Sequence, residues 1–108
     1  MSHYGDYLKE RRAVEVIENE DGFIAFKIHG EECFLEDIYV APEKRKTRIG
    51  SELVLQMETF AKDMSCKYVT CNVWPSAHGS TVSLKAALAN GFKLHSSVVD
   101  KIILIKEL

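Results

Sequence analysis

Residues 33–53 read CFLEDIYVAPEKRKTRIGSEL, and this stretch decides the fold. Its first eight residues are mostly apolar, aromatic or β-branched and predict a strand. Pro42 interrupts that pattern, and apolar residues then recur from position 49 at intervals of three and four, which predicts a helix over 49–64. Residues 67–74, KYVTCNVW, predict a further strand. A strand, a helix and a strand in succession imply two parallel strands joined by a right-handed crossover.

The residues upstream extend this unit into a sheet. Residues 13–18 and 23–29 predict two strands around the turn 19–22, whose final glycine should adopt a positive φ. Together with 33–40 they form an antiparallel meander. A short charged helix is predicted over 4–12.

The residues downstream add a helix and a hairpin. Residues 80–90 predict a helix that begins with Ser80 or Thr81 as N-cap and ends just before Gly91. A hairpin of two strands, 92–96 and 99–106, completes the chain. Its second strand is apolar on both faces and could pair with a second copy, so the sequence allows a homodimer but leaves the oligomeric state open.

Length and composition agree with a single domain. The 108 residues are 46% hydrophobic and 28% charged, values that exclude disorder and low-complexity classes. The chain 1–108 is therefore predicted to be one α+β domain. We expect a mixed, mostly antiparallel sheet with a central parallel strand pair, flanked by helices.

Charge, hydropathy and cysteine content exclude several functions. The net charge of −2 argues against a nucleic-acid binder, which usually carries a basic excess. No apolar run approaches the roughly 20 residues that span a bilayer, and the first residues lack the regions of a signal peptide. The three cysteines, Cys33, Cys66 and Cys71, have no metal-ligand spacing. We therefore predict reduced thiols, no metal and a cytoplasmic location.

Two acids, Glu36 and Asp37, stand inside the strand 33–40. Strict alternation places Glu36 among apolar neighbours, and desolvation of that kind raises a carboxyl pKa, which suits a base working near neutral pH. A bulge that leaves one acid in solvent is the alternative. Under strict alternation the faces would be Phe34, Glu36, Ile38 and Val40 on one side, and Leu35, Asp37 and Tyr39 on the other.

The loop before the helix 49–64 combines basic side chains with a helix N-terminus. Four of the five residues 44–48, KRKTR, are basic, and the first turn of a helix offers free N–H groups and a positive dipole end. Gly50 would let a ligand approach the backbone closely. A phosphate is the expected ligand, and a solvated basic turn is the alternative. The loop follows the C-terminal end of a strand, where open sheets bind ligands.

These segments resemble the GNAT superfamily of acyl-CoA-dependent N-acetyltransferases. The family's pyrophosphate loop has Gln or Arg, two variable residues, Gly, one variable residue, and then Gly or Ala. The run 45–50, RKTRIG, fits its first and last positions. The run 86–92, AALANGF, is similar to the family's second cofactor helix, which usually ends in Gly-Phe. The resemblance extends over residues 13–108. It implies acetyl-CoA as cofactor and acetyl transfer to a primary amine of a small molecule, peptide or protein.

The resemblance also implies roles for individual residues. Leu35-Glu36-Asp37 is similar to the strand motif of the diamine and spermidine/spermine N-acetyltransferases, whose glutamate accepts the amine proton. Glu36 is therefore the expected base, with Asp37 as the alternative. The N–H that polarises the thioester is expected near Val40, where the parallel strands splay apart. The residues expected to bind the cofactor are Ile38, Tyr39, Val40, Arg45, Lys46, Thr47, Arg48, Ile49, Gly50, Ser51 and Ser80.

Three positions depart from the family pattern. Arg48 replaces the first loop glycine, and Ser80 stands where the family often has Asn. Ala87 stands where the family often has the tyrosine that protonates the leaving thiolate. These departures keep a second function open, that of a catalytically degenerate domain that binds CoA or a protein, including as an inhibitor.

Overall fold

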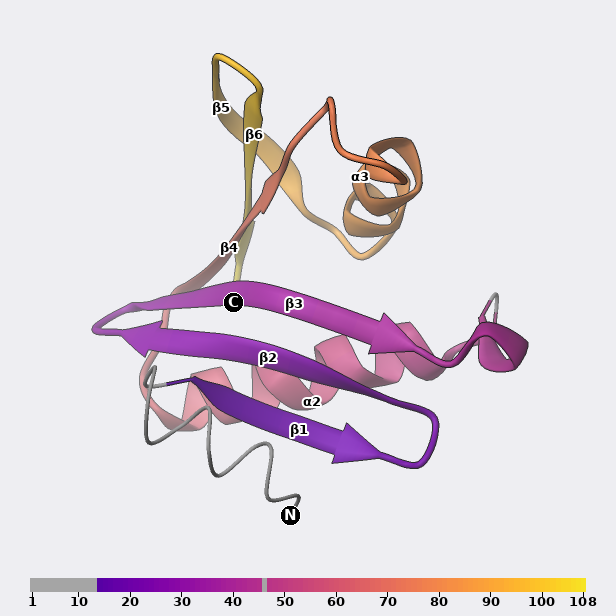
Figure 1. Ribbon diagram of the computed structural model, residues 1–108. Helices are drawn as coiled ribbons and strands as arrows, with labels where there is room; N and C mark the ends of the chain where they lie inside the picture. The colour runs from indigo at the N-terminus through magenta and orange to yellow at the C-terminus, as the bar shows by residue number, and fades with distance from the viewer. Residues whose placement is uncertain (1–13, 46) are drawn as a thin grey trace.

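The computed structural model describes residues 14–45 and 47–108, with the backbone alone at 80–82. The described strands form one sheet in the order β1-β2-β3-β4-β6-β5 (Figure 1). The strands are β1 (Glu15–Asn19), β2 (Gly22–His29), β3 (Glu32–Val40), β4 (Tyr68–Val73), β5 (Lys93–Val98) and β6 (Lys101–Glu107). The helices are α2 (Ile49–Asp63), α3 (Ser80–Ala89) and the 3-10 turn η1 (Pro42–Lys44).

The predicted fold class is confirmed. All neighbouring strands pair antiparallel except β3 and β4, which are parallel and joined by α2. The six predicted strands and the two helices that follow residue 48 are present within a few residues of their expected ends. The helix predicted over 4–12 lies outside the described residues. Within those residues, no helix is long and apolar enough to cross a membrane.

The core lies between the sheet and α2. The predicted stripe is Ile49, Leu53, Met57, Phe60 and Met64. Leu53 and Met57 are fully buried, as is Ala61 beside them, and they belong to one cluster with Phe26 of β2 and Leu104 of β6. The stripe ends earlier than predicted, because α2 ends at Asp63 and Met64 is half exposed. The three cysteines are free and buried, as expected.

Helix α2 ends in a left-handed residue. Cys66 N–H donates to the carbonyl of Ala61 (2.9 Å) and Ser65 N–H to that of Lys62 (3.0 Å), the two bonds of a Schellman cap. Ser65 occupies the position usually taken by glycine, with φ 67°. The same cap closes α3 with the predicted glycine, Gly91, at φ 90°.

The sheet parts between β3 and β4. Their parallel pairing covers four residue pairs, from Glu32 with Tyr68 to Leu35 with Cys71, whereas β3 continues to Val40. Figure 1 shows the result as two half-sheets: β1–β3 over α2, and β4, β6 and β5 beside α3. An ion pair between buried Glu58 of α2 and partly exposed Lys106 of β6 also joins the two halves, with Oε2 and Nζ 2.7 Å apart.

Two predictions about the hairpins are wrong. Gly22 does not adopt a positive φ; a Cβ there would lie 2.1 Å from the carbonyl oxygen of Tyr39, so close strand approach is the reason for the glycine. Strand β6 lies between β4 and β5, so both of its edges are paired and it cannot add a strand from a second copy. The edges of the sheet are β1 and β5.

Candidate functional site

A β-bulge reorients the acidic part of β3. Ala25 pairs with Asp37 and Phe26 with Leu35, so Glu36 is the extra residue. Phe26 belongs to the core under α2, whereas Ala25 packs in a separate cluster with Val14. Asp37 therefore lies on the face away from α2, and the strict alternation predicted for this strand is wrong beyond Leu35.

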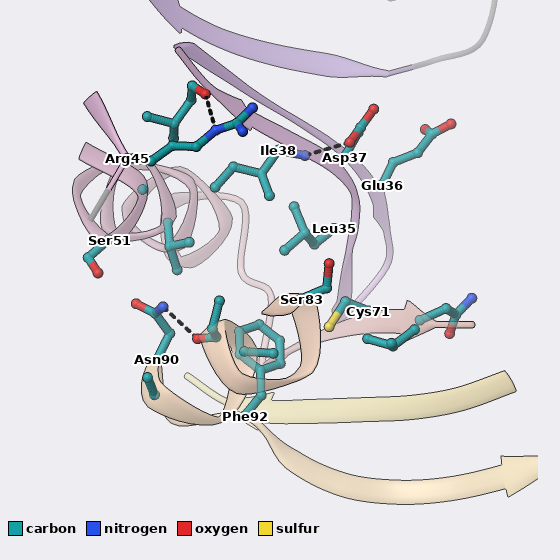
Figure 2. A pocket seen from close by; sticks show the side chains of 18 of the residues that line it. Leu35, Glu36, Asp37, Ile38, Arg45, Ser51, Cys71, Ser83, Asn90 and Phe92 are labelled. Atoms are coloured by element: carbon teal, nitrogen blue, oxygen red, sulfur yellow. Dashed lines mark hydrogen bonds between the residues drawn. The ribbon is translucent and has the colours of Figure 1, made fainter. Parts of the chain in front are cut away.

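The bulge places both carboxylates on one face. Glu36 Oε2 lies 3.9 Å from Lys27 Nζ of β2, so the prediction that Glu36 stands among apolar neighbours on the opposite face is wrong. Asp37 is exposed, and its Oδ1 accepts a hydrogen bond from the N–H of Ile38 (2.9 Å). Figure 2 shows the two carboxylates pointing the same way, away from Leu35. The bulge that leaves one acid in solvent, the alternative interpretation, is confirmed.

A cavity of about 630 Å³ lies in the opening between β3 and β4. The end of β3, the first turn of α2, the end of β4 and one side of α3 enclose it (Figure 2). From the first half-sheet its lining includes Leu35, Glu36, Asp37, Ile38, Val40, Lys44, Arg45, Thr47, Gly50, Ser51 and Val54. From the second it includes Cys71, Asn72, Val73, Trp74, Ala77, His78, Ser83, Ala86, Ala87, Ala89, Asn90 and Phe92.

The N-terminus of α2 forms one end of the cavity. The helix bond from Glu52 N–H to the carbonyl of Arg48 (2.9 Å) is the first of the helix, so the N–H groups of Gly50 and Ser51 precede the ladder. A Cβ on Gly50 would meet only Val40 Cγ2, at 3.8 Å, within a radius of 4 Å. Packing therefore does not require glycine here. The missing side chain leaves space in front of the helix end, where a phosphate would fit.

Two of the predicted cofactor residues contact each other instead. Arg45 Nε donates to the carbonyl of Val40 (3.0 Å), and its guanidinium lies 5.6 Å from the centre of the Tyr39 ring. The other contact of that ring is Phe23, at 6.0 Å between centroids. The Tyr39 side chain lies on the face away from α2 and does not line the cavity.

The structure brings six of the predicted cofactor residues together around the cavity: Ile38, Val40, Arg45, Thr47, Gly50 and Ser51. Ile49 packs against the core instead, and exposed Arg48 precedes the first turn of α2. Lys46 and the side chain of Ser80 lie outside the described residues. Both predicted acids, Glu36 and Asp37, line the cavity.

On the α3 side of the cavity, Ser83 was not predicted. Ser83 stands four residues before Ala87, so the two share one helix face, and Figure 2 shows the Ser83 hydroxyl directed into the cavity, toward Leu35. Cys71 lies where β3 and β4 part. Burial raises the pKa of the Cys71 thiol to about 11, so it is neutral at physiological pH. The sequence offered one indication of this, because a residue four positions before Ala87 lies on the same face of a helix.

The cavity has two electrically different ends. Arg45 and Ser51 stand at one end, beside the positive N-terminus of α2 (Figure 2). Glu36 and Asp37 stand at the other end (Figure 2). One end suits an anion and the other suits a cation. A molecule with a phosphate at one end could therefore meet an amine approaching from the other.

Comparisons with known proteins agree with this geometry. The model of the acetyltransferase (GNAT) family matches residues 6–83. The fold matches PaiA N-acetyltransferase from Thermoplasma acidophilum in complex with coenzyme A, at 26% identity and a TM-score of 0.74, over 82% of this chain and 54% of that one. The chain thus spans about half the length of that relative.

More distant structures share the fold. They include the IAA acetyltransferase from Bacillus cereus, with 18% identity, a TM-score of 0.69, and 82% of this chain and 70% of that chain covered. Another is an aminoglycoside 6′-N-acetyltransferase complexed with coenzyme A, with 17% identity, a TM-score of 0.72, and coverage of 85% and 70%. Among curated protein sequences none shows significant similarity to this chain.

Proposed function

Because the chain belongs to the GNAT family of acetyltransferases, we propose that it binds acetyl-CoA between β3 and β4 and transfers the acetyl group to a primary amine. The observation that carries the proposal is the cavity in the parted sheet, with the open N-terminus of α2 at one end and two carboxylates at the other. Acetyl-CoA, when bound, supplies an acyl thioester.

The residues at the positive end of the cavity fit a pyrophosphate. The backbone N–H groups of Gly50 and Ser51 can donate to phosphate oxygens, and Lys44 borders the same space. Thr47 helps to shape the turn, since its hydroxyl donates to the carbonyl of Lys44 (2.5 Å). Binding in this way depends mainly on backbone N–H groups.

The carboxylate end fits the acceptor. A primary amine is largely protonated at neutral pH, since an alkylammonium has a pKa near 10, and it is attracted by Glu36 and Asp37. It must lose a proton before its lone pair can attack the thioester carbonyl. We propose Glu36 as the base and keep Asp37 as the alternative, because both carboxylates border the cavity on the same face.

The leaving thiolate requires a proton or a hydrogen bond. Ala87 offers neither, whereas the Ser83 hydroxyl points into the cavity from the same helix face. We propose that Ser83 donates a hydrogen bond to the departing sulfur and that water supplies the proton. Positioned acid–base help is typically worth 10²–10⁴-fold, so turnover without a tyrosine at position 87 should be slow.

Two measurements on the purified chain test the proposal. Isothermal titration with acetyl-CoA should show binding, and release of free CoA thiol should require an added primary amine such as spermidine or a lysine peptide. Absence of binding would exclude acetyl transfer. Binding without amine-dependent thiol release would favour the second function, a CoA-binding domain that does not turn over, which Ala87 supports.

Two further expectations stay predictions. A cytoplasmic location accords with three free thiols. A homodimer would have to form through a surface other than β6, such as the edge strands β1 and β5. A monomeric mass in solution across micromolar concentrations would refute the dimer.

A further inference from the structure

The segment between β4 and α3 forms part of the cavity wall and lies away from the N-terminus of α2 (Figure 1). It comprises residues 74–79, WPSAHG, and Trp74, Ala77 and His78 line the cavity. All six residues are exposed, so burial contributes little to holding this wall in place. Inside the segment, the N–H of Ala77 donates to the carbonyl of Trp74 (2.9 Å).

A residue far along the chain holds this segment. The carboxylate of Asp100 accepts two hydrogen bonds from Ser76, from its N–H to Oδ1 (3.1 Å) and from its hydroxyl to Oδ2 (2.5 Å). The pairing of Val73 with Ile102 explains how they meet, because it brings the end of β4 beside the start of β6. Hydrogen bonds to an ionised carboxylate are stronger than neutral ones.

Asp100 adopts a left-handed conformation, which aspartate tolerates, in its own turn. It lies in the two-residue connection between β5 and β6 with φ 54°, a left-handed conformation that favours glycine. Its neighbour Val99 is 97% exposed, so this hairpin tip contributes little to the core. The carboxylate therefore serves the neighbouring segment rather than its own turn.

We propose that Asp100 is a positioning residue for the acceptor. Its carboxylate fixes residues 74–79 so that Trp74 and His78 form the wall against which the amine is held. The segment lies away from the N-terminus of α2 (Figure 1), to which we assign the pyrophosphate, so we expect this contact to act on the acceptor rather than on the cofactor phosphates. The proposal rests on the proposed function, since it assigns a residue that governs one of its two substrates.

The series Asp100→Gly, Asp100→Asn and Ser76→Ala tests the contact. Glycine suits the left-handed turn, so Asp100→Gly removes the carboxylate while relieving backbone strain. We expect it to raise KM for the amine about tenfold, which is the change that corresponds to losing one hydrogen bond to a charged group. The Kd for acetyl-CoA should not change. Asparagine tolerates the same φ and keeps an acceptor for the Ser76 N–H, so it should restore most of the parental KM. Ser76→Ala should be intermediate.

A second readout does not depend on activity. Trp74 is the only tryptophan of the chain, so its fluorescence reports on this segment directly. Asp100→Gly should lower the anisotropy of Trp74 and increase its quenching by acrylamide. As a matched control, Asn19→Ala removes a side chain that accepts hydrogen bonds from Asp21 N–H and Gly22 N–H in the β1–β2 turn. It should leave Trp74 fluorescence and the amine KM unchanged.

The outcomes separate this proposal from the function on which it rests. Unchanged Trp74 fluorescence in Asp100→Gly would overturn the proposal whether or not the parent is active. Altered fluorescence with an unchanged amine KM, or with KM for acetyl-CoA raised equally, would also overturn it. If the parent binds acetyl-CoA but acetylates no amine, the proposed function fails and the acceptor role fails with it, while the fluorescence still decides whether Asp100 holds the segment.

Discussion

Replacing Gly50 by alanine should make the protein more stable and its cofactor binding weaker. The new methyl group would contact Val40 Cγ2 at 3.8 Å, an ordinary van der Waals distance, so the fold accommodates it. Alanine is the better helix former, and within the first turn of α2 we expect a gain of about 0.5 kcal/mol. For a domain of this size, that gain raises Tm by about 3 °C.

The same methyl group occupies the space in front of the N–H groups that we assign to the pyrophosphate. Each charge-assisted hydrogen bond lost costs about 1.5–3 kcal/mol, so the Kd for acetyl-CoA should rise about 10- to 100-fold. Thermal unfolding without ligand gives the first quantity, and isothermal titration gives the second. Because Tm should rise while affinity for acetyl-CoA falls, the loss of affinity cannot be attributed to a general destabilisation of the protein.

Thr59→Ala is the matched control on the same helix. Thr59 is exposed, and its hydroxyl donates to the carbonyl of Leu55 (3.0 Å). Alanine there also raises helix propensity, but no atom is added to the cavity, so affinity should not change. If Gly50→Ala binds acetyl-CoA as tightly as the parent, the pyrophosphate does not lie at this helix end and the site assignment is wrong.

Three other changes probe the rest of the structure. Ser65→Gly should raise the unfolding free energy by about 1 kcal/mol, because glycine adopts φ 67° without penalty; no rise in Tm would contradict the left-handed cap. Burial raises the thiol pKa of Cys33 to about 12 and of Cys71 to about 11, from 9.0. The folded protein therefore keeps protons that the unfolded chain loses above pH 9, and its stability should fall as pH rises, by at most about 1.4 kcal/mol per unit and thiol; a shallower slope in Cys71→Ala, measured by urea unfolding, checks this. Glu36→Gln should slow acetyl transfer by about 10²-fold or more with cofactor affinity unchanged; if Asp37→Asn slows it more, Asp37 is the base, and if neither does, the amine loses its proton directly to water.

Local patterns predicted the elements because they depend on neighbours along the chain. The stripe that contains Leu53 and Met57 follows from helical geometry alone, and both residues are fully buried. The glycine-terminated end of α3 is equally local, and Gly91 adopts the expected positive φ. The start of α2 near Gly50, with its free N–H groups, was also predicted from the local sequence.

Predictions failed where the outcome depends on distant partners. The bulge at Glu36 is set by the register of β3 against Ala25 and Phe26 of β2, and nothing inside β3 specifies that register. Arg45 fits the phosphate motif and lines the cavity, but the motif does not reveal that its Nε also donates to the carbonyl of Val40. The wall that carries Trp74 depends on a contact from Ser76 to a residue 24 positions further on.

The parted sheet has a consequence for how the protein melts. The two half-sheets are joined by four residue pairs of β3 and β4, by the ion pair between Glu58 and Lys106 and by a shared hydrophobic cluster that includes Phe26 and Leu104. A ligand bound in the cavity touches both halves and acts as an additional link. Its binding free energy therefore also makes the two halves unfold more cooperatively. Hydrogen exchange should show the two halves opening separately without ligand and together with it. The cavity is thus the boundary at which we expect the two halves to separate first, and a bound ligand should oppose that separation.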